Sequence, residues 1–147
     1  MYVKEILLRK GRGIKTMPPS ELLEFAAAHM KLEGVGALIV CDDNRKLKGI
    51  LSERDIVCAM VDYGPRALQM SAAEFMNAHP PTCAPEDTIA SAAKSMTQNR
   101  VRQLPVIENG AIIGIISIGD IVKERFEEME LERDTLRDLA LSHQLVS

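Results

Sequence analysis

Hydrophobic residues along this chain alternate between the spacing of amphipathic helices and the continuous runs of buried strands. In the first half the pattern predicts a lead-in helix over residues 3–8, a short strand over 14–16, a helix ending near 33–34, strands over 35–41 and 47–52, and a helix from 55 to about 61. Ser20, which follows two prolines, is the expected N-cap of the first long helix. Glycines within residues 10–13 and 62–65 break the helices that precede them.

The same order of elements returns in the second half of the chain. A connector over residues 63–70 leads to a second lead-in helix over 71–76, an irregular strand over 80–83, a helix start at 85–88, and two strands followed by a further helix. Asn109-Gly110 between these strands is typical of a type I′ hairpin turn.

Direct comparison of the two halves indicates an internal repeat. The stretch Gly49-Ile50-Leu51-Ser52-Glu53-Arg54-Asp55 returns in edited form as Gly114-Ile115-Ile116-Ser117-Ile118-Gly119-Asp120, an offset of 65 (114 − 49). Further upstream the offset is 66 (82 − 16), and the identical pairs are Thr16/Thr82, Pro19/Pro85, Ala26/Ala92, Ala27/Ala93, Met30/Met96, Val35/Val101, Leu38/Leu104 and Val40/Val106. The one-residue difference falls in the hairpin turn, where loops tolerate it. We therefore expect one unit used twice.

The repeat predicts the fold class and the division of the chain. We expect an α/β (α+β) protein of two β-α-β-β-α repeats in one compact domain, because 147 residues can bury a shared core whereas one repeat of about 60 residues would be marginal. Repeat 1 is expected over residues 1–62, the connector over 63–70, repeat 2 over 71–125 and a helical tail over 126–147.

The tail is densely charged but carries apolar residues at roughly heptad spacing. Phe126, Met129, Leu136 and Ala140 follow this spacing, and Arg133 and His143 interrupt it. Two interpretations remain open: a solvated terminal helix that lies on its own domain, or a helix that contacts a second subunit.

Composition and charge exclude several classes of function. A net charge of −3 provides no broad basic field, so we expect no nucleic-acid binding. No run of 18 apolar residues and no leader pattern is present, so we expect no membrane span and a cytoplasmic protein. Three cysteines without C-x-x-C spacing are expected to be buried free thiols.

The two Ser-x-x-Asp sequences are the main candidates for chemistry. Ser52 with Asp55, and Ser117 with Asp120, could simply cap the helices that follow. Each pair also ends a predicted buried strand at a helix N-terminus, where N–H groups attract phosphate and a carboxylate can accept from sugar hydroxyls. A ribose-phosphate site and simple capping both remain open. Arg102 is expected to be buried at the start of a strand and therefore to need an anion or a carboxylate.

Other chemistries find no support in the sequence. The three histidines are scattered without metal-ligand spacing, and no Walker-type sequence is present. Gly34-Val35-Gly36-Ala37-Leu38-Ile39 lacks the last glycine of a dinucleotide fingerprint and follows a helix. No activated nucleophile can be assembled, so we expect a protein that is not an enzyme and that requires no cofactor or metal.

With its Pro-led helices, apolar strands and Gly-to-Asp strand-helix junctions, the chain resembles a tandem pair of CBS domains. The specific matches are the stretch from Val101 to Val106 and the stretch from Gly114 to Val122, and the resemblance covers residues 3–125. Ile39 stands where this family often has proline. The chain is most similar in organisation to the small stand-alone CBS-pair proteins of bacteria. The resemblance implies that the repeats pack about a pseudo-twofold axis and leave two clefts for adenosine-containing ligands.

The resemblance also implies the residues of each cleft. In one cleft, Asp120 would hold the ribose, Ser117 would lie beside the phosphate with Arg102, and the adenine walls would be Val35, Gly36, Ala37 and Ile115, with Gly119 nearby. The other cleft would use Ile50, Ser52, Arg54 and Asp55, completed by Val101 and Gln103. Ile14, Lys15 and Thr16, and likewise Pro81 and Thr82, would close the entrances.

The implied function is that of a sensor. AMP, ADP, ATP, NADH or S-adenosylmethionine would bind as a regulatory ligand, the protein would form a homodimer, and an unknown protein effector would read the change. The alternative is a structural homodimerisation module whose clefts hold no nucleotide.

Overall fold

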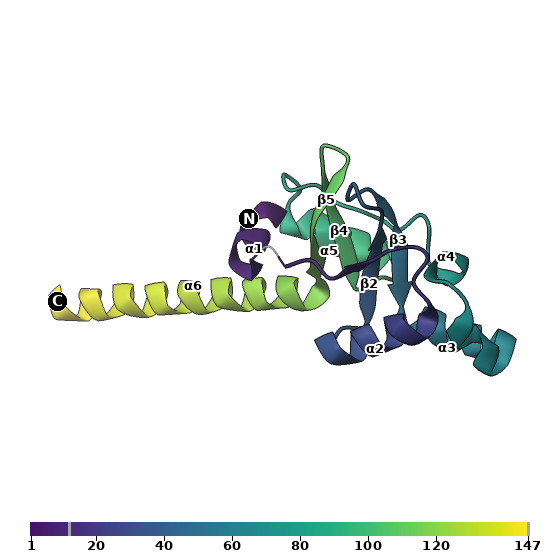
Figure 1. Cartoon of the computed structure of the whole chain (residues 1–147). Helices are drawn as coiled ribbons and strands as arrows, with labels where there is room; N and C mark the ends of the chain where they lie inside the picture. Colours follow the sequence, from purple (N-terminus) through teal and green to yellow (C-terminus); the bar gives the residue numbers. More distant parts are fainter. Residues whose placement is uncertain (12, 147) are drawn as a thin grey trace.

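The computed structural model describes residues 1–11 and 13–146. Arg12 and Ser147 lie outside the described residues, and with them the parts of the predicted 10–13 break and of the tail that fall there. The chain forms a body of two small sheets flanked by helices, from which one long helix projects (Figure 1). This architecture confirms the predicted mixed α/β class.

The first repeat contains a three-stranded sheet in the order β1-β2-β3. β1 runs parallel to β2, and β2 is antiparallel to β3. The core of this repeat contains Leu23, Leu38 and Leu51, from a helix and two strands. The elements are β1 (Thr16–Met17), α2 (Leu23–Glu33), β2 (Ala37–Cys41), β3 (Leu47–Ser52), α3 (Glu53–Tyr63) and the 3-10 helix η1 (Gly64–Gln69).

The second repeat contains an antiparallel hairpin of β4 and β5. The irregular segment before α5 joins this hairpin through a parallel bridge between Cys83 and Val106, in the place that β1 takes in the first repeat. Met96, Leu104 and Ile116 are buried in this core. The elements are α5 (Ile89–Asn99), β4 (Gln103–Glu108), β5 (Ala111–Ser117) and α6 (Ile118–Val146).

Strand register in the two repeats is equivalent. Ala37 pairs with Ser52 in the first hairpin, and Gln103 pairs with Ser117 in the second. Both hairpins have one register shift, at equivalent places in β2 and β4. The duplicated geometry confirms that the chain is one unit used twice.

Each lead-in helix packs on the other repeat and not on the repeat that it precedes in the sequence. α1 (Val3–Lys10) precedes the first repeat, yet Val3 and Ile6 are buried in the second core and the Val3 N–H donates to the Asp87 carbonyl (2.9 Å). α4 (Ala72–Phe75) precedes the second repeat, yet the Ala72 N–H donates to the Glu21 carbonyl of the first (2.7 Å). The two lead-in helices are therefore exchanged between the repeats.

Two equivalent glycines lie where the exchanged helices contact the strands. A Cβ added at Gly49 would lie 2.5 Å from the backbone oxygen of Asn77, just after α4. A Cβ added at Gly114 would lie 2.6 Å from Cδ2 of Leu7 in α1. Both close contacts are possible because glycine has no side chain. The neighbour of Gly49 is a backbone atom, whereas the neighbour of Gly114 is the end of a flexible side chain.

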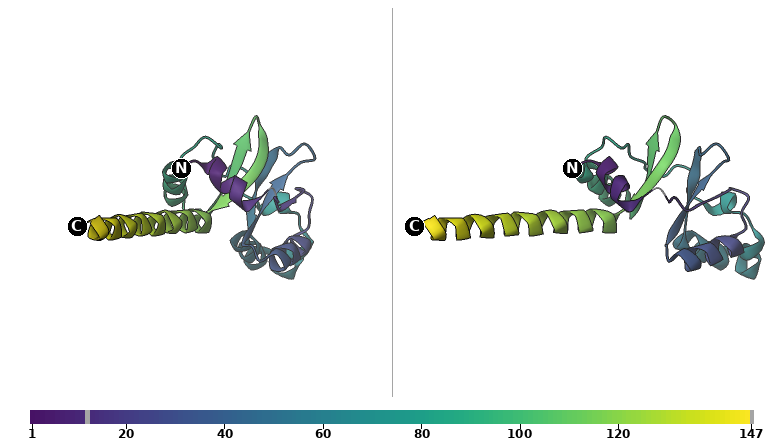
Figure 2. Two further views of the ribbon diagram at one scale, coloured as in Figure 1. Left: turned by 90° about the vertical axis from the view of Figure 1, so that its left-hand side faces the viewer. Right: turned by 60° about the vertical axis from the view of Figure 1, so that its left-hand side comes forward.

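The two repeats meet through the sheet faces that point away from their own hydrophobic cores. Ile39, Cys41 and Ile112 are buried there, and Ile14 and Ile115 pack against them. Figure 2 shows the two hairpins standing side by side. This contact places the ends of β3 and β5, and the Ser-Asp sequences that follow them, beside the boundary between the repeats.

Ser20 is not the N-cap of α2, so that prediction is wrong. Leu22 occupies this position, and no side chain of a described residue caps the helix with a hydrogen bond. Leu22 instead forms an isolated bridge with Ser71, and the Leu23 N–H donates to the Met70 carbonyl (2.9 Å). A segment almost fifty residues away satisfies the helix start, which a local pattern does not reveal.

Two further local predictions have different outcomes. The first strand is Thr16–Met17, so Ile14 and Lys15 lie before it. The hairpin turn is confirmed, because Asn109 (φ 52°) and Gly110 (φ 78°) both have the positive φ of a type I′ turn.

All three cysteines are free, as predicted, but their burial differs. Cys41 and Cys83 are buried, whereas Cys58 on α3 is exposed, so the expectation of burial is wrong for Cys58. Burial, with a smaller contribution from nearby Asp87, raises the pKa of the Cys83 thiol to about 12.

The tail does not lie on its own domain. It is part of α6, and every side chain from residue 129 to residue 143 is exposed. The interpretation as a helix resting on its own body is therefore wrong for residues 129–143. Within residues 1–11 and 13–146, no helix has the length and apolar content needed to cross a membrane.

Candidate functional site

Both Ser-x-x-Asp sequences form capping boxes at strand-to-helix junctions. The Asp55 N–H donates to Ser52 Oγ (3.2 Å), and the Ser52 N–H donates to Asp55 Oδ2 (2.8 Å). The same two bonds join Ser117 and Asp120, with the same lengths of 3.2 and 2.8 Å. Each carboxylate thus uses Oδ2 to fix the junction, and within the described residues its Oδ1 accepts no hydrogen bond.

Asp120 has a further partner that Asp55 lacks among the described residues. Lys10, at the end of the exchanged helix α1, donates to Asp120 Oδ2 (2.8 Å) and to the Ile115 carbonyl (3.0 Å). Burial of the carboxyl opposes its ionisation, but the hydrogen bonds from Lys10 and from the Ser117 backbone prevail. The pKa of Asp120 therefore lies below its ordinary value of 3.8.

A cavity of about 130 Å³ opens beside this ion pair, between α1 and the start of α6. Arg9 at its edge forms ion pairs with Glu124 and Glu127, the latter at 3.0 Å. Its charged lining offers three basic and three acidic side chains, and the full lining is Ile6, Arg9, Lys10, Asp120, Lys123, Glu124 and Glu127.

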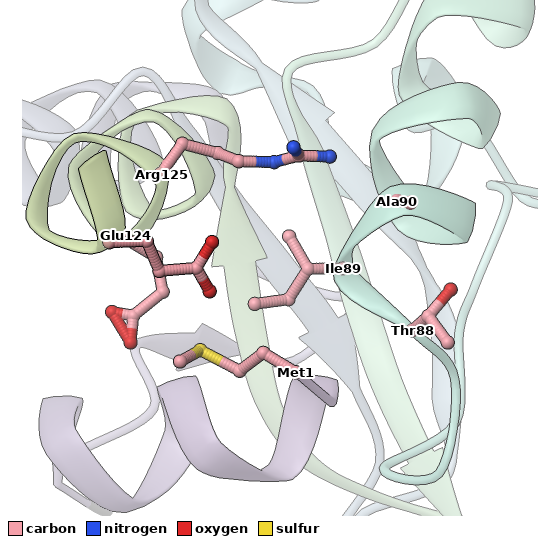
Figure 3. A pocket seen from close by; sticks show the side chains of 7 residues that line it. Met1, Thr88, Ile89, Ala90, Glu124 and Arg125 are labelled. Atoms are coloured by element: carbon pink, nitrogen blue, oxygen red, sulfur yellow. The ribbon is translucent and has the colours of Figure 1, made fainter. Parts of the chain in front are cut away.

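A second cavity, of about 210 Å³, lies on the outer side of the second repeat. Figure 3 shows Glu124 and Arg125 of α6 on one side of it and Ile89 with Met1 on the other. Among the described residues, none from 13 to 87 lines either cavity, and Asp120 is the one predicted site residue that does. Both cavities therefore lie away from the residues expected to wall an adenine.

Several predicted residues lie on the strand faces that meet between the sheets. Side chains alternate along a strand, and Leu104 and Val106 point into the second core, so Gln103 lies on the opposite face with Ile107. Gln103 Oε1 is buried there and has no hydrogen-bond donor among the described residues. The same alternation places the following predicted residues on the facing surfaces of the two sheets: Ala37, Ile50, Ser52, Ile115 and Ser117.

Val35, Val101 and Gly36, which were also predicted to line the clefts, do not lie on these facing surfaces. Val35 packs against the first core and Val101 against the second, so each side chain contacts its own repeat. The Gly36 carbonyl accepts from the Glu53 N–H (2.9 Å), and Glu53 Oε1 lies 2.9 Å from the point where a Gly36 Cβ would be. The acidic side chain of Glu53 thus covers the backbone that was expected to wall an adenine.

Arg102 is exposed, so the argument that its buried guanidinium needs an anion is wrong. Its backbone carbonyl accepts from the Ile118 N–H (2.8 Å), which is the bond that Gly36 and Glu53 make in the first repeat. The backbone of Arg102 thus connects the start of β4 to the start of α6, while its side chain lies in solvent.

The remaining predicted residues differ in their burial and contacts. Ile14 packs in the cluster between the sheets together with Ile115, whereas exposed Lys15 forms an ion pair with Glu33 (3.3 Å). Thr16 begins β1 and Pro81 is half-buried, and the following are exposed: Arg54, Thr82 and Gly119.

Three basic residues near Asp120 escaped the sequence analysis: Arg9, Lys10 and Lys123. Because α1 packs on the second repeat, Lys10 contacts Asp120 and Arg9 lines the same cavity. The basic end of the first lead-in helix is the sequence signal that could have suggested these two residues. Within the described residues no group of three His, Cys, Asp or Glu side chains could hold a metal ion.

Comparisons with known proteins agree with this duplicated architecture. The family model for the CBS domain matches residues 3–62 and again 72–127. The chain therefore belongs to the CBS domain family, which confirms the resemblance.

Solved structures and a curated relative show the same organisation. The CBS-domain containing protein ATU1752 from Agrobacterium tumefaciens is 38% identical, with a TM-score of 0.80 over 85% of this chain and 99% of that chain. CBSX2, solved in complex with AMP, has a TM-score of 0.75 at 22% identity and covers 87% of this chain and 98% of its own. The CBS domain-containing protein YhcV of Bacillus subtilis is 31% identical over 108 residues, which are 74% of this chain and 76% of YhcV. Other curated relatives are longer, and the matches cover between 21% and 66% of them.

Proposed function

We propose that this protein is a non-catalytic regulatory module that binds an adenosine-containing ligand between its two repeats. The observation that carries the proposal is Gln103 Oε1 on the face of β4 that meets the other sheet, a buried oxygen for which the described residues offer no donor. Such an oxygen is uncommon because leaving it unpaired costs about 1–3 kcal/mol. The amino group of adenine is a donor of the required kind, and the AMP complex of CBSX2 supports this ligand class.

The capping boxes suit the rest of such a ligand. Oδ1 of Asp55 and Oδ1 of Asp120 are free to accept from ribose hydroxyls while Oδ2 keeps its capping bond. The helix N-termini beside them, at the starts of α3 and α6, favour a phosphate. Lys10 adds a cation at Asp120 alone, so the two sites would differ in affinity.

The proposed mechanism is that of a sensor. AMP, ADP, ATP or NADH would favour one arrangement of the repeats, and of the two subunits of a homodimer, only through a higher affinity for that arrangement. A protein effector would then read the difference.

The second candidate is a homodimerisation module without a nucleotide. The ion pair between Lys10 and Asp120 favours it, because the carboxylate expected to hold ribose already has an internal partner (2.8 Å).

Thermal unfolding with AMP, ADP, ATP, NADH or S-adenosylmethionine at about millimolar concentration tests the proposal on protein freed of bound nucleotide. A ligand at 100 times its dissociation constant adds about 2.7 kcal/mol to the free energy of unfolding. The midpoint should then rise by roughly 5–10 °C for a chain of this size. No rise with any of the five ligands would favour the second candidate.

Three variants separate binding from folding. Asp55→Asn and Asp120→Asn should each lower stability modestly and weaken ligand binding at their own site. Asp87→Asn is the matched control: Asp87 Oδ2 also accepts a backbone N–H, from Ala84 (2.8 Å), but lies outside the proposed sites. Asp87→Asn should therefore lower stability and leave the ligand-induced shift unchanged.

A further inference from the structure

α6 carries an apolar face that its own body leaves uncovered. The helix has 29 residues, about 43 Å at 1.5 Å per residue. Among its residues 118–143, the buried and half-buried side chains all lie in the first three turns. Ile121 is buried in the second core and Glu124 is buried against Arg9. Both ribbon views in Figure 2 show the rest of the helix extending away from the body.

The uncovered face follows a heptad repeat. Positions at alternating steps of four and three have the spacing of a coiled-coil seam, and apolar residues fill all of them from 122 to 140 except 133: Val122, Phe126, Met129, Leu136 and Ala140. Their large members are 60%, 61%, 67% and 67% exposed, in chain order. With Phe126 at position a, Arg133 and His143 occupy the remaining a and d positions.

The body holds α6 by the opposite side of the helix. In the same heptad Ile121, Glu124 and Glu128, which are buried or half-buried, fall at positions c, f and c. Docking on the body therefore leaves positions a and d facing outward from the first turns onward. A second helix can lie along the seam without displacing any contact that α6 makes with its own repeat.

The charges beside the seam identify the partner and its direction. In a parallel pair of identical helices, a g residue faces the e residue five positions later in the other helix. Here Arg125 faces Glu130, and Glu132 faces Arg137, so both layers join opposite charges. Glu132 at position g also lies next to the a-position Arg133 of the other helix. An antiparallel pair centred on Glu132 would instead bring two copies of that carboxylate together.

We propose that α6 pairs with α6 of a second copy of this chain as a parallel, in-register coiled coil over residues 122–143. The seam comprises three heptads, about 33 Å. A single exposed helix of this length is marginal in water, and pairing gives it the tertiary contact that stabilises helices. The proposal is independent of nucleotide binding.

Disulfide trapping in the full chain tests the pairing. In a Cys58→Ser background, which removes the exposed thiol, one chain carries Leu136→Cys at position d and another carries Leu131→Cys at position f. The two leucines are matched, with exposures of 67% and 69%. In a glutathione buffer at micromolar protein, Leu136→Cys should form intermolecular disulfides at least tenfold faster. Equal rates, or no disulfide from Leu136→Cys, would overturn the proposal.

Ala140→Cys in the same background tests the direction. A parallel pair brings the two introduced thiols together at position a. An antiparallel pair centred on Glu132 separates them by 16 residues, roughly 24 Å, and forbids the disulfide. Failure of Ala140→Cys to cross-link where Leu136→Cys succeeds would therefore overturn the parallel arrangement.

Circular dichroism of variants without introduced cysteines tests the pairing independently of cross-linking. Leu136→Lys should reduce helicity at 222 nm and make the tail melt at lower temperature, whereas Leu131→Lys should leave both unchanged. Wild-type tail melting should also shift upward with protein concentration. Identical melting for the two variants would show that the apolar face is not paired.

Discussion

Replacement of Gln103 by methionine should stabilise the protein and weaken its ligand binding together. Gln103 Oε1 is buried with no donor among the described residues, and an unpaired buried oxygen costs about 1–3 kcal/mol. Methionine has nearly the same length and no polar carbonyl, so Gln103→Met removes that cost and keeps most of the packing. We expect the free energy of unfolding of the ligand-free protein to rise by about 1 kcal/mol, which is roughly 2–4 °C in the midpoint.

The same substitution removes the acceptor proposed for adenine. Loss of one hydrogen bond of about 1 kcal/mol should weaken ligand binding by about fivefold. Urea unfolding without ligand measures the first effect, and calorimetric titration with the ligand that raises the midpoint most measures the second. Gln98→Met is the matched control, because Gln98 is exposed on α5 and its change should stay within about 0.5 kcal/mol.

The opposite signs of the two effects make the prediction easy to refute. If Gln103→Met lowers the free energy of unfolding, the oxygen has a partner in solution and the argument from its burial fails. If stability rises but affinity is unchanged, the oxygen is unpaired but does not contact the ligand.

Two further predictions concern the exchanged helices. Gly49→Ala forces the backbone oxygen of Asn77 to move by about 1 Å and should lower the free energy of unfolding in urea by about 2–3 kcal/mol. Gly114→Ala contacts the flexible end of the Leu7 side chain and should lower it by only about 1 kcal/mol, so equal losses would contradict the packing described. Lys10→Met should lower stability by about 0.5–1 kcal/mol at pH 7, since both partners are partly exposed. Because the pKa of Asp120 is lowered in the folded protein, its ionised form stabilises the protein above about pH 4, and this stabilisation disappears as the pH falls through the folded pKa. The free energies of unfolding of the wild type and of Lys10→Met should therefore converge in acid. A constant difference between them down to pH 3 would contradict this.

The sequence predicted the features that depend on local chemistry. The Ser-x-x-Asp spacing indicates a capping box by itself, and both boxes form. Asn109-Gly110 indicates its turn because few residues adopt positive φ in succession. The repeat predicted the second half from the first because equivalent residues meet equivalent neighbours in each sheet.

The features that depend on long-range packing could not be predicted in this way. Both lead-in helices are short and carry apolar residues, and neither pattern shows which repeat the helix covers. The approach of Lys10 to Asp120, 110 residues apart, depends on that choice. Arg102 was misjudged because its strand is buried, although its own side chain leaves the strand start toward solvent.

The exchange of lead-in helices also sets an order in which parts of the chain can fold during synthesis. Every residue of the first core lies between residues 17 and 76, so that core can close as soon as this stretch has left the ribosome. α1 leaves earlier, but its partners extend to Ile121. Ile121 follows the end of α1 by 111 residues (121 − 10), so at about 5–20 residues per second Val3 and Ile6 stay uncovered for roughly 6–22 s. α1, which is made before both repeats, is therefore among the last elements to dock, and it joins the finished first repeat to the second.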